Sequence, residues 1–370
     1  MFPKISSPSK ALSEFILALN LSLSKPQMRH AVDVVDSLIV CESTKTLSVL
    51  NRQLLKPKDV YALADFFTYS PWNPDQVRLQ IGYYLIKWAL EHSYKDSPIF
   101  ISIDDSMTKK PKESRHFEPV DWHHDHLGGG SSYSYGLGFI TCRIQIENCS
   151  FTVNHRLYMR EKTVRRLNRN RSKEKRFKFR SKYSLARAML LDLLSLIPKE
   201  RKVYILFDSW YSSAKLIKFC LRHKWQVICA LKHNRLLDGK RLSSHAKYLR
   251  NKSFIPVRVS SAESMTEYLT YSLKGHLNGI SGEVCVIISK RHSRDRRPEY
   301  FLSTDLSLSV ERILNWYTKR WSCEVDYLYL KGRLGLEDFR LRLSRGHHQV
   351  LFLGLFSFSI SSISFSQRTR

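Results

Sequence analysis

The chain has 370 residues, 43% of them hydrophobic, which is enough for two or three domains with a substantial core. Its 61 Lys and Arg outnumber 33 Asp and Glu, and the net charge of +28 indicates a polyanionic partner, most simply nucleic acid. Seven scattered cysteines, odd in number and without a CxxC pair, argue against a disulfide framework and a zinc ribbon, so we expect reduced thiols in a cytoplasmic protein.

Neither end of the sequence predicts a membrane segment. The apolar stretch 15–21 is short and lacks the small-residue cleavage pattern of a signal peptide. The stretch 350–365 has only 16 residues, five of them Ser, whereas a bilayer span needs about 20 mostly apolar residues. We therefore expect no membrane partner, and we interpret 350–365 as a buried terminal helix or strand.

Residues 1–95 have a helical pattern. Helices are predicted at 27–39 and 58–67, and Asn73 is placed to cap a third helix that begins at Pro74. We expect residues 1–95 to form a helical N-terminal domain that binds DNA, with a simple packing lobe as the alternative.

Residues 96–235 change to an α/β pattern. The apolar runs predicted as strands are 98–103, 138–144, 203–207 and 226–231. Asp104 and Asp105 follow the first run, Asp208 follows the third, and Ser212 or Ser213 is placed to cap a helix before the fourth. The result is a β-α-β unit with Asp208 at the carboxyl end of its first strand, where α/β folds usually place ligands.

Residues 236–305 have an all-β pattern, and helical periodicity returns after Leu308. Four strands are predicted in the β segment, at 253–260, 266–273, 283–289 and 299–302. We therefore predict an α/β core made of 96–235 and 306–370, interrupted by a β insertion at 236–305.

The most informative motif lies in the last helical region. Tyr317, Arg320, Glu324 and Lys331 are spaced by three, four and seven residues. On a regular α-helix these four side chains fall within an arc of roughly 60°. A carboxylate flanked by two cations and a phenol suits a site that holds a metal ion and grips phosphates around it.

Two upstream carboxylates complete a candidate catalytic set of Asp105, Asp208 and Glu324. Hard oxygen ligands of this kind suit Mg²⁺ or Mn²⁺, and two such ions can drive an in-line phosphoryl displacement. Asp104 is the alternative to Asp105, because neighbouring residues of a strand point to opposite faces and at most one is expected in the site. Asp326 competes less well with Glu324, since it lies ~180° from Tyr317 on the helix.

These residues resemble a known family. The spacing Y-(2)-R-(3)-E-(6)-K of the helical motif matches the signature of insertion-sequence transposases of the DDE type. The surroundings of the two aspartates and of the following strand are similar to that family as well. The similar stretches are 72–75, 103–110, 207–211 and 230–235.

The resemblance implies a ribonuclease H-like core with a β insertion, and Asp105, Asp208 and Glu324 as ligands of Mg²⁺ or Mn²⁺. It implies that Tyr317, Arg320 and Lys331 hold backbone phosphates of double-stranded DNA near the transposon end. Cleavage there frees a 3′-hydroxyl that attacks target DNA, and the pairing of two ends implies a homodimer on DNA. In some relatives an aromatic residue of the insertion stacks on a flipped base. The insertion contains no Trp, and its candidates are Tyr248, Phe254, Tyr268 and Tyr271.

A basic stretch at 160–182 holds 12 Lys and Arg against two Glu. We expect it to contact DNA phosphates, with a solvated basic helix or loop as the alternative. The residues proposed for this contact are Arg165, Arg166, Arg169, Arg171 and Lys182.

Three functions fit these patterns. The first is a DNA transposase that acts on the inverted repeats of its own insertion sequence in the cytoplasm of a prokaryote, associated with the nucleoid. The second is a metal-dependent nuclease without strand transfer. The third is a catalytically inactive basic DNA-binding protein.

Overall fold

The structure is a computed structural model that describes residues 10–113, 117–124, 133–260, 265–295, 297–339 and 354. The predicted terminal segment 350–365, apart from Gly354, lies outside these residues. The N-terminal helices are α1 (Lys10–Ala18), α2 (Lys25–Val40), α3 (Leu47–Gln53), α4 (Val60–Thr68) and α5 (Pro74–Glu91). The three helices expected before residue 95 are therefore confirmed as α2, α4 and α5. None of the described helices is long and apolar enough to cross a bilayer.

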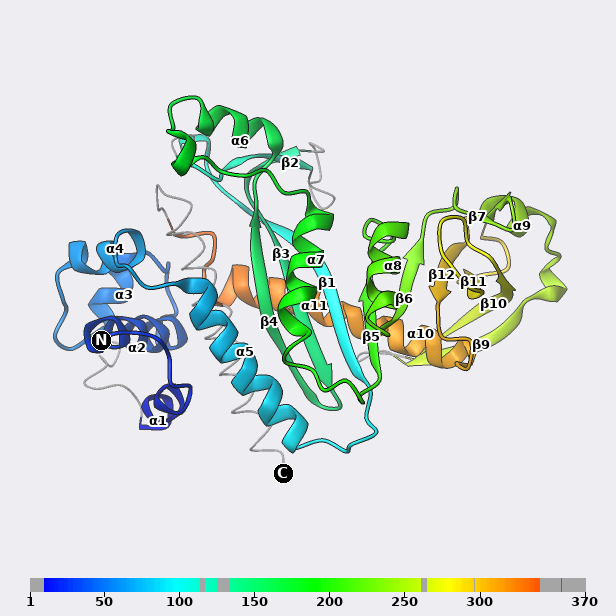
Figure 1. The fold of residues 1–370 in the computed structure, drawn as a ribbon, viewed down its shortest axis with the longest axis horizontal. Helices are drawn as coiled ribbons and strands as arrows, with labels where there is room; N and C mark the ends of the chain where they lie inside the picture. The colour runs from blue at the N-terminus through cyan, green and yellow to red at the C-terminus, as the bar shows by residue number, and fades with distance from the viewer. Residues whose placement is uncertain are drawn as a thin grey trace.

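Ten of the described strands form one large mixed sheet (Figure 1). Its strands are β1 (Ile99–Lys109), β2 (Asp121–His124), β3 (Tyr133–Ile146), β4 (Cys149–Tyr158), β5 (Val203–Phe207), β6 (Gln226–Leu231), β9 (Ile255–Ser260), β10 (Met265–Gly275), β11 (Val284–Lys290) and β12 (Glu299–Ser303). The order is β2-β3-β1-β5-β6-β12-β11-β10-β9, and β4 also pairs with β3. Strands β4, β3 and β1 are antiparallel, whereas β1, β5 and β6 are parallel, an arrangement consistent with a ribonuclease H-like domain.

The segment expected as a β insertion continues this sheet, because β12 pairs with β6 of the core. Its four predicted strands are confirmed as β9 to β12. One expectation was wrong, since α9 (Leu242–Tyr248) interrupts the all-β pattern. A tight hairpin of β7 (Leu236–Leu237) and β8 (Lys240–Arg241) turns at Asp238 and Gly239, both with positive φ, and directs the fully buried Leu242 into the core.

Helices cover both faces of the sheet (Figure 1). On one face α7 (Lys182–Leu193) and α8 (Ala214–Arg222) pack over the alternate residues of β1 that include Ile101 and Ile103. On the other face α10 (Val310–Thr318) packs over Phe100, Tyr204 and Leu206. Helix α8 begins after Ser213, whose hydroxyl accepts a hydrogen bond from the backbone N–H of Leu216, as the sequence predicts.

The region of the Y-R-E-K motif is less regular than the sequence predicts. Helix α10 passes through a 3₁₀ turn at Lys319–Trp321 into α11 (Ser322–Leu328), and a π turn follows at Tyr329–Arg333. The tighter and wider turns change the rotation per residue, so the arc derived for a regular α-helix does not apply along the whole motif.

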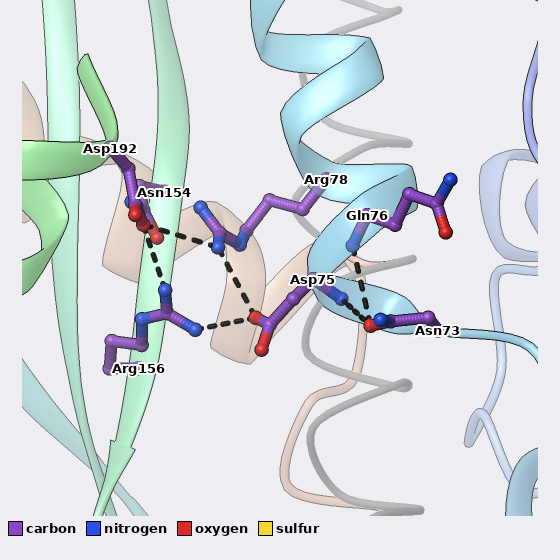
Figure 2. Close-up of polar contacts among 7 residues, drawn as sticks. All are labelled: Asn73, Asp75, Gln76, Arg78, Asn154, Arg156 and Asp192. Atoms are coloured by element: carbon purple, nitrogen blue, oxygen red, sulfur yellow. Dashed lines mark hydrogen bonds and ion pairs between the residues drawn. The ribbon is translucent and has the colours of Figure 1, made fainter. Parts of the chain in front are cut away.

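An ionic network joins the N-terminal helix α5 to the core (Figure 2). The Arg78 guanidinium, whose side chain is 4% exposed, lies 3.2 Å from Asp75 and 3.3 Å from Asp192 of α7. Arg156 of β4 binds the same two carboxylates, and its guanidinium is 2.8 Å from Asp192. Two cations and two anions therefore hold α5, β4 and α7 together. At the start of α5 the Asn73 side chain accepts from the N–H groups of residues 75 and 76, which confirms the predicted cap.

A buried lysine joins β1 to the segment that follows the π turn. The ammonium of Lys110, at the end of β1, donates to the carbonyls of Leu336, Glu337 and Phe339. The Lys109 N–H donates to the Glu337 carboxylate at 2.9 Å. Three carbonyls satisfy the three donors of a buried ammonium, so this contact fixes where the chain leaves the motif region.

Removing one anion from the ionic network should destabilise the fold. Asp192→Asn leaves Arg78 and Arg156 with a single carboxylate, and we expect the free energy of unfolding to fall by about 2–4 kcal/mol. Urea unfolding measures it. Glu91→Gln is the control, because Glu91 forms an exposed ion pair with Lys87, both on α5. This variant should lower the free energy of unfolding by no more than about 0.5 kcal/mol. Equal effects of the two variants would contradict the structural role of the network.

Candidate active site

The pairing of two parallel strands brings the upstream aspartates together. The ladder between β1 and β5 ends with Ile103 opposite Phe207, so Asp104 and Asp208 are the next residues on the two strands. One expectation needs correction, because Asp104 and Asp105 do not end their strand. Strand β3 keeps pairing with the other edge of β1 as far as Lys109, and β1 continues with it.

The two neighbouring aspartates of β1 have different partners, as expected for opposite faces of a strand. The Asp104 carboxylate accepts a hydrogen bond from the Arg320 guanidinium at 2.7 Å, on the face covered by α10. The Asp105 carboxylate accepts one from the Tyr211 hydroxyl at 2.8 Å and forms an ion pair with Lys182.

Asp208 lies in the turn between β5 and α8. Its carboxylate accepts hydrogen bonds from the backbone N–H groups of Trp210 at 3.0 Å and Tyr211 at 3.2 Å. Burial raises the pKa of Asp208, and the nearby Asp105 adds to the increase, while the backbone hydrogen bonds and Arg320 oppose it.

Arg320 connects the helical motif to the strands. Its guanidinium donates to Glu324 at 2.8 Å as well as to Asp104, and the side chain is 15% exposed. Burial lowers the pKa of Arg320, but Tyr317, Asp104 and Glu324 outweigh burial and raise it. The Tyr317 ring lies under the guanidinium, 5.8 Å away, and packs against Phe301.

The site holds more negative charge than its internal cations neutralise. The pKa of Asp104 is raised from 3.8 to about 7, first by burial and then by Asp208 and Asp105, against the effect of Arg320. Glu324 keeps 36% of its side chain exposed, so it borders solvent at the edge of this group. An added cation would relieve the repulsion among these carboxylates.

Asp326 belongs to the interior and not to this group. Its carboxylate pairs with Arg143 of β3 and accepts from the Thr152 hydroxyl of β4 at 2.8 Å, with 2% of the side chain exposed. Lys331 lies half-buried in the π turn. Glu324 and Asp326 therefore face different surroundings, as the helical geometry predicts.

A cavity of about 550 Å³ lies beside Arg320. Its lining includes Ser209, next to Asp208, and Lys232 at the end of β6, together with Tyr317. Among the described residues no three His, Cys, Asp or Glu side chains stand close enough to bind one metal ion together. The carboxylate oxygens have the chemistry that Mg²⁺ and Mn²⁺ prefer, but cations of the protein bind them in this structure.

Comparison with known families agrees with this geometry. Residues 19–250 match the family described as DDE superfamily endonuclease. The chain belongs to the DDE superfamily of endonucleases. Residues 180–359 also match the family described as transposase DDE domain, which supports a DDE transposase or endonuclease. The DDE protein has no significant match among curated proteins.

The basic stretch of the DDE protein divides into two groups. Arg165, Arg166 and Arg169 are exposed on or next to α6 (Glu161–Asn168), which projects from the sheet beside β2 (Figure 1). Arg165 forms an exposed ion pair with Glu161, one turn earlier on α6. Arg171 and Lys182 are less exposed and form ion pairs with Glu118 and Asp105. All three side chains of the first group are exposed, so an external polyanion can reach them.

The insertion aromatics also differ in exposure. Tyr248 is 81% exposed, whereas Phe254 is 7% exposed and packs against Tyr271. Tyr268 is half-buried, as is Tyr271.

Sequence reasoning missed two side chains of the site. Tyr211 binds Asp105, and Trp210, 48% exposed, has the ammonium groups of Lys182 and Lys232 at 5.9 and 5.0 Å from its ring centre. Both belong to the stretch 207–211 that resembles the transposase family, so their place two and three residues after Asp208 was the available signal.

The raised pKa of Asp104 predicts a pH-dependent stability. The folded protein holds this proton more tightly than the unfolded chain, so the contribution of Asp104 is largest below pH 4 and is lost as the pH rises through about 7. Asp104→Asn removes the charge, and the variant should gain roughly 2–4 kcal/mol relative to the unmodified protein between pH 4 and pH 8. Urea unfolding in metal-free buffer measures the difference, and a difference that does not change with pH would contradict the buried charge.

Proposed function

We propose that the chain is a DNA transposase that cleaves the terminal inverted repeats of its own insertion sequence and joins the freed 3′-hydroxyl to target DNA. The observation that carries the proposal is a group of carboxylates from strands and a helix that are far apart in sequence. Arg320 binds Asp104 and Glu324, and Asp208 and Asp105 lie close enough to raise the pKa of Asp104. Phosphoryl transfer needs this combination of anions for metal ions and cations for phosphates.

In this proposal Asp105, Asp208 and Glu324 hold Mg²⁺ or Mn²⁺. When bound, the metal ions activate the attacking oxygen and stabilise the leaving oxygen. Tyr317, Arg320 and Lys331 grip the phosphates on either side of the scissile bond, and the adjoining cavity, with Lys232 in its wall, accepts part of a nucleotide.

Asp105 is preferred to Asp104 as the ligand for two reasons. At neutral pH a proton competes for Asp104, whose pKa is about 7. The Asp105 side chain is also more exposed, at 23% against 14% for Asp104. The strand register favours Asp104, the neighbour of Asp208, so the two aspartates have to be compared directly by substitution.

Further parts of the proposal concern DNA and assembly. The exposed arginines of α6 and its end contact double-stranded DNA, as the basic stretch predicts. The protein acts as a homodimer on DNA, because two transposon ends have to be held together for transfer. Its location is the cytoplasm of a prokaryotic cell, in association with the nucleoid.

The carboxylates can be tested with labelled duplexes that carry the inverted repeats flanking the gene, in Mg²⁺ or Mn²⁺. Asp105→Asn, Asp208→Asn and Glu324→Gln should each lower the rate of end cleavage by at least about 100-fold, since a metal ligand contributes several kcal/mol to the transition state. Asp104→Asn should have a smaller effect. Glu311→Gln, an exposed carboxylate of α10, is the matched control and should cut normally.

Three outcomes would change the proposal. Full activity in all three variants would show that the site is wrong. Cleavage without capture of target DNA by the freed 3′-hydroxyl would leave a nuclease, and DNA binding without any cleavage would leave an inactive DNA-binding protein.

The exposed arginines can be tested by the salt dependence of DNA binding. Replacing Arg165, Arg166 and Arg169 by Gln should reduce the slope of log affinity against log salt by about one for each DNA phosphate that the protein no longer neutralises. Replacing the same three by Lys keeps the charge and should keep the slope. An unchanged slope in the Gln variant would place the DNA elsewhere.

A further inference from the structure

Each side of the candidate site is bound by a cation of the protein. The Lys182 ammonium pairs with the Asp105 carboxylate, and the Arg320 guanidinium bridges Asp104 and Glu324 at 2.7 and 2.8 Å. In this arrangement no three acidic side chains among the described residues are positioned to share a metal ion. The internal cations thus bind Asp105 and Glu324, whereas Asp208 accepts from the backbone N–H groups of Trp210 and Tyr211.

Lys182 is the more easily displaced of the two cations. It is the first residue of α7, on a flexible stem, and 26% of its side chain is exposed. Its ammonium lies 5.4 Å from the ring centre of Tyr158 and 5.9 Å from that of the exposed Trp210. Lys232 lies at the same indole ring. A phosphate that approaches Trp210 therefore meets two ammonium groups, one of which, Lys182, pairs with Asp105.

A phosphate group and a carboxylate compete for the same ammonium. Once DNA takes Lys182, Asp105 loses its counter-charge and its affinity for a divalent cation must rise. The same exchange applies to Arg320, which lines the cavity next to Asp104 and Glu324.

We propose that Lys182, supported by Arg320, keeps the metal site closed in the DNA-free protein and opens it when DNA phosphates bind these cations. The inference rests on the proposed function, because it assumes that DNA and a divalent ion meet at this site. It gives Lys182 a positioning role: the lysine couples metal binding to DNA binding, so that the hydrolytic centre is assembled only on DNA. By linkage the coupling is reciprocal, and metal strengthens DNA binding by the same factor.

The test measures direct binding of Mn²⁺ to the full chain. Binding is detected as the loss of the free-ion signal in electron paramagnetic resonance. A duplex carrying the inverted repeat that flanks the gene supplies the DNA, and Mn²⁺ bound by the duplex alone is subtracted. The duplex should raise the Mn²⁺ affinity of the unmodified protein about tenfold or more, within the range of typical coupling between sites. Lys182→Gln should raise the DNA-free affinity by roughly fivefold to tenfold and reduce the effect of DNA accordingly.

Two matched variants separate the specific effect of the Lys182–Asp105 ion pair on metal binding from a general effect of charge. Lys218→Gln removes one exposed positive charge from the neighbouring helix α8 and should change the DNA-free affinity by less than about twofold, because exposed charges are screened. Lys182→Arg keeps the ion pair and should keep the low DNA-free affinity.

The outcomes distinguish this inference from the function on which it rests. The proposed role of Lys182 is wrong if Lys182→Gln binds Mn²⁺ no better than Lys218→Gln. It is also wrong if DNA leaves the Mn²⁺ affinity unchanged while the unmodified protein cleaves the transposon ends. In either case the transposase proposal stands. If the unmodified protein binds no Mn²⁺ with or without DNA, both are wrong.

Discussion

Carboxylates that share a partly buried space need positive charge close by, and the end of the parallel strands is organised around this need. Strands β1 and β5 place aspartates side by side, and burial then makes their negative charge costly. Arg320 and Lys182 reach them from segments far away in sequence. The positions of α7 and of the segment from α10 to α11 therefore depend on the negative charge of these carboxylates as well as on the apolar core beneath the sheet.

The network between α5 and the core shows what a balanced group of the same kind looks like. There two arginines meet two aspartates, and the result is a structural joint. At the sheet end four carboxylates meet one guanidinium and one ammonium, and the pKa of Asp104 rises to about 7. The excess of anions over cations, more than the presence of ion pairs, distinguishes the candidate active site from the joint.

Local patterns in the sequence were enough to predict the elements that carry the site. Apolar runs located β1, β5 and β6, and the choice between Ser212 and Ser213 as a cap indicated the start of α8 to within one residue. The partner of each carboxylate could not be predicted in the same way, because Lys182 and Asp105 are 77 residues apart and Arg143 and Asp326 are 183 apart. Alternation along β1 indicated that Asp104 and Asp105 differ in face. Only the crossing of α10 and α11 over the sheet decides which of them meets Arg320. The 3₁₀ and π turns of the motif depend on that packing too.

The buried Lys110 has a mechanical consequence. Its three hydrogen bonds to carbonyls attach the end of β1 to residues 336–339, and the Asp326–Arg143 ion pair attaches α11 to β3. The strand with Asp104 and Asp105 and the helix with Glu324 are thus fastened to one another on both sides of the carboxylates. The backbones of this strand and this helix are therefore held at a fixed spacing. The long side chains between them can still change rotamer, so a change of substrate contact can be transmitted without movement of the backbone.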